Sequence, residues 1–150
     1  MMDEQIRVRT ETRYAELYDD LKRLVVGEFH NLFFICASLG YSANKRKTLS
    51  KAQDRFWSKT ITPWEWTCYY AMLLKDENMD LNTIADDKKV IRVIEEYSNA
   101  GMEIFLEELL SNFLLAGQKV PRIDQSASKE LSKVTLGYIF SRCSPDIEAR

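Results

Sequence analysis

The sequence predicts a single, mainly α-helical domain (an all-α fold class). Its 150 residues, 45% of them hydrophobic and 29% charged, are enough to build one hydrophobic core. The chain contains only five glycines and three prolines, which favours helices over many short strands and turns. We expect a compact domain of five to six helices over residues 1–150, with frayed ends at about residues 1–9 and 144–150.

Two helices are predicted in the first third of the chain. Apolar residues recur at three- and four-residue steps over residues 11–25, which is typical of an amphipathic helix, and Thr10 is a suitable N-cap. Residues 29–39 are apolar nearly all round, which predicts a central buried helix. Gly40 follows where a helix often ends in a left-handed conformation.

The middle of the chain combines an ambiguous segment with a clear helix start. Residues 49–61 suit either a helix or a short strand or hairpin, and both alternatives stay open. In the run that follows, Thr62 and Glu65 form a capping box, and Pro63 suits the first helical position. This run therefore predicts a helix that continues to about residue 75.

The C-terminal half carries a long helical stripe and a last helix. Apolar residues at helical spacing run from about residue 86 almost to Gly117. Residues 98–101 are expected to break or kink this stripe, so one bent helix and two consecutive helices fit equally well. Residues 126–143 are predicted to form the terminal amphipathic helix.

The sequence offers little for catalysis. His30 is the only histidine, which excludes sites that need two or more, and we expect His30 and Cys36 to be structural because both lie on the predicted buried helix. The glycine-rich motifs that hold nucleotide phosphates are missing from the sequence. We therefore expect no catalytic residue, no cofactor and no metal.

A metal-dependent nuclease is the weaker alternative. It would use acidic residues of a predicted linker and helix start, together with one lysine: Asp76, Asp80, Asp86, Asp87 and Lys88. Clustered carboxylates can hold Mg²⁺. Helix capping and the helix dipole explain acidic residues at these positions better.

Export and membrane insertion are not predicted. The three cysteines are far apart and form no C-x-x-C pair, so neither a disulfide framework nor a zinc site is expected. The start of the chain lacks a signal peptide, and the longest apolar run, residues 32–37, is too short to span a bilayer. We expect a cytoplasmic protein without membrane contact.

Charge is unevenly distributed, although the net charge is only −2. The candidate nucleic-acid-binding residues are the six basic residues of the segment 45–59: Lys45, Arg46, Lys47, Lys51, Arg55 and Lys59. If this segment is helical, four of them recur at four-residue steps and form a cationic ridge that can contact DNA phosphates. In the alternative interpretation, the basic loop docks on the acidic helices or faces water.

The acidic and aromatic residues supply candidate contacts for a protein partner. Residues 76–108 contain ten acids against three bases, and such a stretch can recruit a basic partner. Tryptophan is a favoured anchor at protein interfaces. The candidate partner-binding residues are Trp57, Trp64, Glu95, Glu96 and Glu103.

Two parts of the chain resemble a known family. Residues 33–41 (Phe-Phe-Ile-Cys-Ala-Ser-Leu-Gly-Tyr) with the basic loop 45–49, and residues 95–103 (Glu-Glu-Tyr-Ser-Asn-Ala-Gly-Met-Glu), are similar to the small dnd-system-associated proteins. These proteins accompany DNA phosphorothioation and related bacterial anti-phage loci. The chain departs from the family pattern at four positions: Asn44, Thr48, Ser98 and Ala100.

The resemblance implies an accessory role in prokaryotic defence against foreign DNA. It supplies no catalytic residues. We expect a non-catalytic subunit that binds a larger nuclease, ATPase or DNA-modification partner in a defence complex. The alternative is a DNA-binding accessory protein that contacts the phosphate backbone through the basic segment 45–59.

Overall fold

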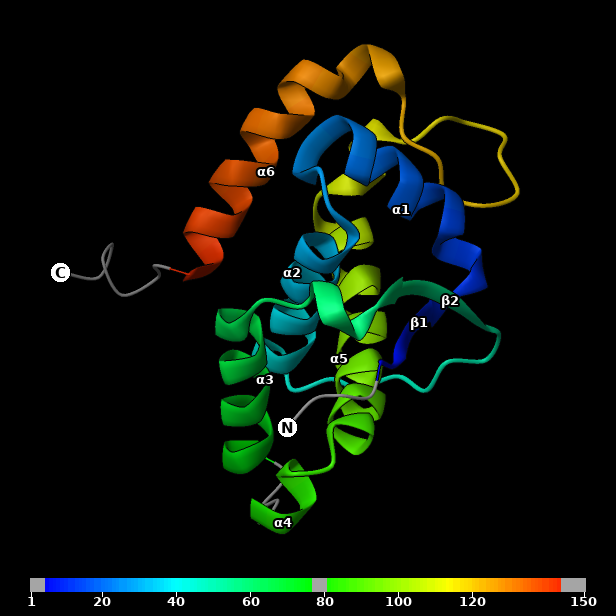
Figure 1. Ribbon diagram of the computed structural model, residues 1–150. Helices are drawn as coiled ribbons and strands as arrows, with labels where there is room; N and C mark the ends of the chain where they lie inside the picture. Colours follow the sequence, from blue (N-terminus) through cyan, green and yellow to red (C-terminus); the bar gives the residue numbers. More distant parts are fainter. Residues whose placement is uncertain (1–4, 77–80, 144–150) are drawn as a thin grey trace, which may run out of the picture.

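A computed structural model describes residues 5–76 and 81–143 and shows a mainly helical fold with a two-stranded sheet (Figure 1). In chain order, the strands and α-helices are β1 (Arg7–Glu11), α1 (Ala15–Leu21), α2 (Phe29–Ser42), β2 (Ala52–Trp57), α3 (Pro63–Asp76), α4 (Leu81–Ile84), α5 (Asp87–Glu108) and α6 (Ser128–Cys143). A π-helical turn, Lys22–Val26, follows α1. The mainly helical class is therefore confirmed, with a small sheet added.

The centre of the fold is the crossing of α2 and α5. Both Gly40 and Gly101 lie inside these helices, and each faces the backbone of the other helix. A Cβ atom at Gly40 would overlap the carbonyl group of Tyr97, and one at Gly101 would overlap the carbonyl group of Cys36. The two backbones touch here because neither helix carries a side chain at the crossing.

This crossing corrects two sequence-based predictions. Gly40 does not end α2, which continues to Ser42, and residues 98–101 do not break α5, which runs from Asp87 to Glu108. Both glycines were interpreted as local backbone signals. Their role is instead close helix packing, which depends on a segment about 60 residues away in the chain.

The sheet forms from segments where the sequence suggested other structure. Residues 7–9 were expected in a frayed end, but β1 pairs antiparallel with β2, with an irregularity between Val8 and Arg9. The first α-helix begins at Ala15, so Thr10 belongs to β1 and is not its N-cap. Val8 is fully buried and alternates with half-buried arginines, which explains the strand. The expected frayed C-terminus lies outside the described residues.

The remaining helices agree with the sequence patterns in part. The capping box is confirmed, since the Glu65 N–H donates to Thr62 Oγ1 (3.2 Å) and the Thr62 N–H donates to Glu65 Oε1 (2.9 Å). The stripe predicted almost to Gly117 ends earlier, because α5 stops at Glu108 and a short 3₁₀ turn follows. For residues 49–61, where a helix and a short strand were both open, the structure has the strand β2, which pairs with the distant β1.

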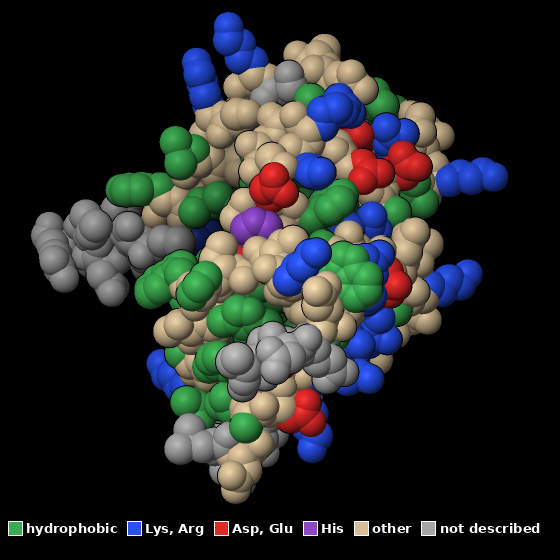
Figure 2. Space-filling view, in the orientation of Figure 1, with side chains coloured by type: hydrophobic (Ala, Val, Ile, Leu, Met, Phe, Trp, Pro, Cys, Tyr) green, Lys and Arg blue, Asp and Glu red, His purple; other side chains and the backbone are tan. Residues whose placement is uncertain are grey.

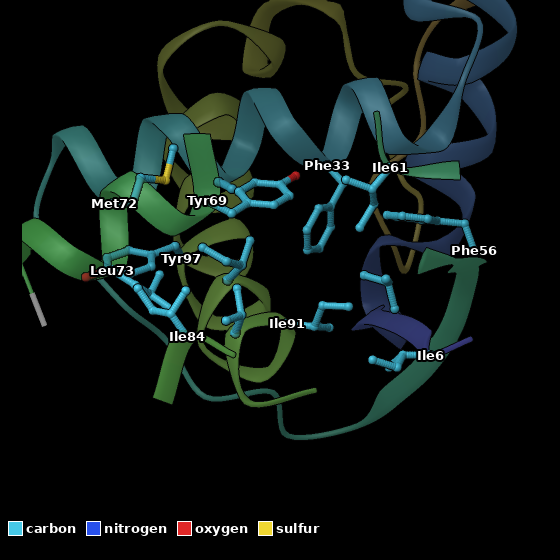
Figure 3. Packing of buried hydrophobic residues seen from close by; sticks show 14 residues of the cluster. Ile6, Phe33, Phe56, Ile61, Tyr69, Met72, Leu73, Ile84, Ile91 and Tyr97 are labelled. Atoms are coloured by element: carbon cyan, nitrogen blue, oxygen red, sulfur yellow. The ribbon is translucent and has the colours of Figure 1, made fainter. Parts of the chain in front are cut away.

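Two hydrophobic clusters lie on either side of the helix crossing. Figure 3 shows the first, in which Phe33 of α2 and Ile91 of α5 meet Phe56 of β2 and Tyr69 of α3. The rings of Phe33 and Phe56 are 5.3 Å apart in an edge-on arrangement. The second cluster joins α1, the other end of α5 and the start of α6. Helices α2 and α5 contribute to both clusters and so connect them.

The glycine crossing predicts a strong effect of one methyl group. Gly101→Ala should lower the free energy of unfolding by at least about 2 kcal/mol, because the added carbon overlaps backbone that cannot rotate away. The matched control is Gly137→Ala in α6, where a Cβ meets nothing within 4 Å; it should raise stability by about 0.5–1 kcal/mol. Urea unfolding of the three proteins measures both effects. Equal stabilities for the two variants would contradict the crossing.

Candidate functional site

The site is built on a buried carboxylate of α5, that of Glu95, which is 1% exposed. Its oxygens accept hydrogen bonds from the backbone N–H of Arg9 (2.8 Å) and from the Arg9 guanidinium (2.8 Å), and Arg92 reaches it at 2.6 Å. The hydrogen bond that Arg9 donates to Glu95 raises the pKa of Arg9, although burial opposes this. Glu95 thus ties β1 to α5. The prediction that it contacts a partner is wrong, because it is enclosed by its own chain.

The basic loop docks on the acidic face of the same helix. Arg46 pairs with Glu96 at 2.8 Å, and the ammonium group of Lys47 pairs with Glu103, which raises the pKa of Lys47. The Lys47 N–H also donates to the carbonyl of Glu96 (3.1 Å). Of the alternatives for the basic loop, docking on an acidic helix is therefore the one that holds for Arg46 and Lys47. The same ion pairs match the charges of Glu96 and Glu103 within the chain.

The far end of the loop is held by a carboxylate at the end of β1, that of Glu11. It accepts hydrogen bonds from the backbone N–H groups of Ser50 (3.0 Å) and Lys51 (2.7 Å) and from the Ser50 hydroxyl (2.9 Å). Burial alone would raise the pKa of Glu11, but these hydrogen bonds hold it below its ordinary value. Asn99 of α5 also donates to the carbonyl of Lys47 (3.2 Å), so the loop is fixed along its length.

The cationic ridge predicted for residues 47–59 does not form. A helix is required to align Lys47, Lys51, Arg55 and Lys59, and this segment is a loop followed by β2. Arg55 is half-buried, donates to Thr10 Oγ1 (3.0 Å) and lies over the ring of Tyr18, and burial lowers its pKa. Three predicted cations, Lys45, Lys51 and Lys59, are exposed and make no ion pair with the described residues.

Arg13 is a cation that the sequence analysis missed. Together with Lys47 and Lys51 it lines a cleft of about 410 Å³ between the turn before α1 and the basic loop. Arg13 lies two residues beyond β1, in the segment that was interpreted as a helix. The alternation of polar residues with Val8 was the signal that could have identified the strand and placed Arg13 beside the loop.

His30 and the tryptophans occupy different environments. His30 Nδ1 lies 2.9 Å from the carboxylate of Glu65, a partner that agrees with the structural role expected for His30. Cys36 is fully buried, and burial raises the pKa of its thiol. The predicted partner-binding tryptophans are exposed, Trp57 to 40% under the guanidinium of Arg7 and Trp64 to 70%. Their partner role stays a prediction.

Two of the carboxylates proposed for a nuclease, Asp86 and Asp87, have structural partners. Asp86 caps α5 by accepting hydrogen bonds from the N–H groups of Lys88 and Lys89. Asp87 accepts a hydrogen bond from the hydroxyl group of Tyr70 (2.7 Å). Asp80 and the side chain of Asp76 lie outside the described residues. Among the described residues, no group of three or more metal-binding side chains is found.

An apolar surface lies on the other side of the molecule. Leu136 and Phe140, one helical turn apart on α6, are 71% and 62% exposed. Beside them, a groove of about 120 Å³ separates α6 from α2 and is lined mainly by Phe34, Ile35 and Ile139. Figure 2 shows hydrophobic side chains gathered along the left edge, where α6 and α3 lie in Figure 1. This surface contrasts with the charged face of the loop.

The described helices do not include one that is long and apolar enough to cross a membrane by itself. Only the bent pair 12–26 and 29–42 meets that criterion, and only when its two parts are counted together.

The three segments that carry the family resemblance meet in space. Ser98 donates to the carbonyl of Phe33 (3.3 Å), Asn99 bonds the basic loop, and Gly101 lies against Cys36. They define a small helical protein with a docked basic loop. Residues 7–120 match the family model of DNA sulphur modification system-associated protein 4, and the chain belongs to this family. No curated protein and no solved structure matches the chain.

The Glu11 contacts predict a loss of stability in acid. Because its folded-state pKa lies below the ordinary value of 4.5, ionised Glu11 stabilises the fold above about pH 4.5, and this contribution is lost as the pH falls through the folded-state pKa. Glu11→Gln should therefore lower the free energy of unfolding near neutral pH and flatten its decline in acid. Glu107→Gln, at an exposed carboxylate, is the control and should follow the unchanged protein. Parallel pH profiles for all three would contradict the role of Glu11.

Proposed function

We propose that this chain is a non-catalytic accessory subunit of a DNA sulphur modification system in prokaryotic, anti-phage defence. It acts in the cytoplasm and binds a larger nuclease, ATPase or DNA-modification protein of that system. The observation that carries the proposal is the exposure of Leu136 and Phe140 beside the apolar groove of α2 and α6.

The chemistry of this surface suits a protein partner. Burying an exposed leucine or phenylalanine contributes about 1.5–3 kcal/mol, so Leu136 and Phe140 together are a substantial source of affinity. The groove offers room for an apolar side chain of the partner, between Phe34, Ile35 and Ile139. The ion pair between Arg142 and Glu108 (3.4 Å) adds a polar edge. Apolar anchors surrounded by polar groups are typical of protein interfaces.

The position of α6 in the chain supports a partner-specific role. The family match ends at residue 120, before α6 begins at Ser128. The groove therefore has one wall from the matched segment, α2, and one from beyond it, α6. We infer that α2 and α5 form the family frame, while α6 adapts the surface to the partner of this chain.

Direct DNA contact through the basic segment 45–59 has less support. Arg46 and Lys47 are paired with carboxylates, and Arg55 is half-buried. A segment with half of its cations engaged internally offers few charges for backbone phosphates.

The test is co-purification with defined proteins. The tagged chain is co-expressed with the proteins of the DNA sulphur modification system from the same genome, and the stoichiometric complex is quantified after nuclease treatment. Leu136→Asp with Phe140→Asp should weaken the complex at least about 30-fold, since loss of interface anchors typically costs 2 kcal/mol or more.

The matched control places the same two charges at exposed positions away from α6 and α3, with Leu115→Asp and Gln118→Asp. This variant should retain the complex. Leu136→Ala with Phe140→Ala serves as a milder pair if the aspartates lower the melting temperature. A complex that survives both α6 variants, or a chain that binds no protein of the system, would overturn the proposal.

A further inference from the structure

A second surface feature, separate from the apolar groove, is the cleft of about 410 Å³ beside the basic loop. Its walls come from the turn after β1, from the loop before β2, from Asn99 of α5 and from Val120. The Thr12 N–H and hydroxyl both donate to the carbonyl of Lys51, at 2.8 and 2.7 Å, so the walls are fixed to each other. The cleft is thus part of the folded frame, and its volume falls within the range of small-molecule sites.

The charges in this cleft are not balanced. Arg13, Lys47 and Lys51 face Glu11 as the only carboxylate of the lining. The Glu11 oxygens already accept hydrogen bonds from Ser50 and Lys51, and Lys47 is paired with Glu103 just outside the lining. Arg13 and Lys51 make no ion pair with any described residue. Two cations without an ion-pair partner therefore line one cleft, and its lining is net positive, with three cations against the single carboxylate of Glu11.

We infer that this cleft binds the phosphate groups of a nucleotide or a nucleic-acid strand. A guanidinium and an ammonium group on the walls of one cleft suit an oxyanion with several charged oxygens, since Arg13 can donate two parallel hydrogen bonds while Lys51 supplies a point charge. The volume exceeds that of a single small anion and leaves room for the attached sugar or base. The inference does not depend on the protein partner of α6.

The experiment measures binding of three probes to the purified chain: a labelled duplex DNA, a nucleoside monophosphate and inorganic phosphate. Arg13→Gln with Lys51→Gln removes the two free cations of the cleft. The control, Lys45→Gln with Lys59→Gln, removes two equally exposed lysines of the basic segment that do not line the cleft. Circular dichroism checks that both variants are folded.

If the cleft binds a DNA backbone, the chain binds the duplex with an affinity that falls with salt. The cleft variant should then lose at least tenfold in affinity and reduce the slope of log K against log salt by about 2, whereas the control changes little. Binding of the monophosphate alone, lost in the cleft variant, identifies a free nucleotide as the source. Binding of inorganic phosphate with the same loss identifies the phosphate group itself.

Two results would overturn the inference. Equal weakening by the cleft and control variants would mean that any DNA binding is diffuse attraction to a basic segment. If the unchanged chain binds none of the three probes, the cleft is not a phosphate site.

Discussion

The close crossing of α2 and α5 is the constraint on which the rest of the structure depends. Gly40 and Gly101 let the two backbones touch, and this contact fixes how far apart α2 and α5 lie where they pack into both hydrophobic clusters. Interiors are packed at near-crystalline density, so a displacement here cannot be absorbed locally. It would also move Asn99, which holds the basic loop, and Phe34 and Ile35, which line the apolar groove. The two candidate surfaces therefore share one internal frame.

Buried carboxylates connect the outer segments to that frame. Glu95 is matched by Arg9 and Arg92 and holds the sheet against α5. Asp20 of α1 plays the same part at the other end, because it pairs with Arg122 (3.0 Å) of the segment that leads to α6. Arg23 of the π-helical turn also pairs with Asp20 (3.1 Å). Removing one partner from such an arrangement leaves a buried charge uncompensated, which is strongly destabilising. Much of the charge of this protein is thus used for its own fold, which leaves few free cations for a ligand.

The sequence predicted the features that depend on local signals. The capping box at Thr62 and the apolar period of the central helices were sufficient to place α3, α2 and most of α5. The strand β1 was missed because it is short and its partner lies more than 40 residues away. The basic loop could be identified but not placed, since the pairing of Arg46 with Glu96 is visible only after folding. For the same reason, the sequence alone did not show that Arg13 lies beside the basic loop.

We propose that the matched family segment forms a frame and that α6 with α2 forms the surface for a larger protein. Hydrogen–deuterium exchange of the chain alone and in complex with the co-purified sulphur-modification protein tests this directly. We expect added protection in α6 (Ser128–Cys143) and in the facing part of α2, with little change over residues 45–57. Added protection confined to the basic loop and β2, with α6 unchanged, would contradict it.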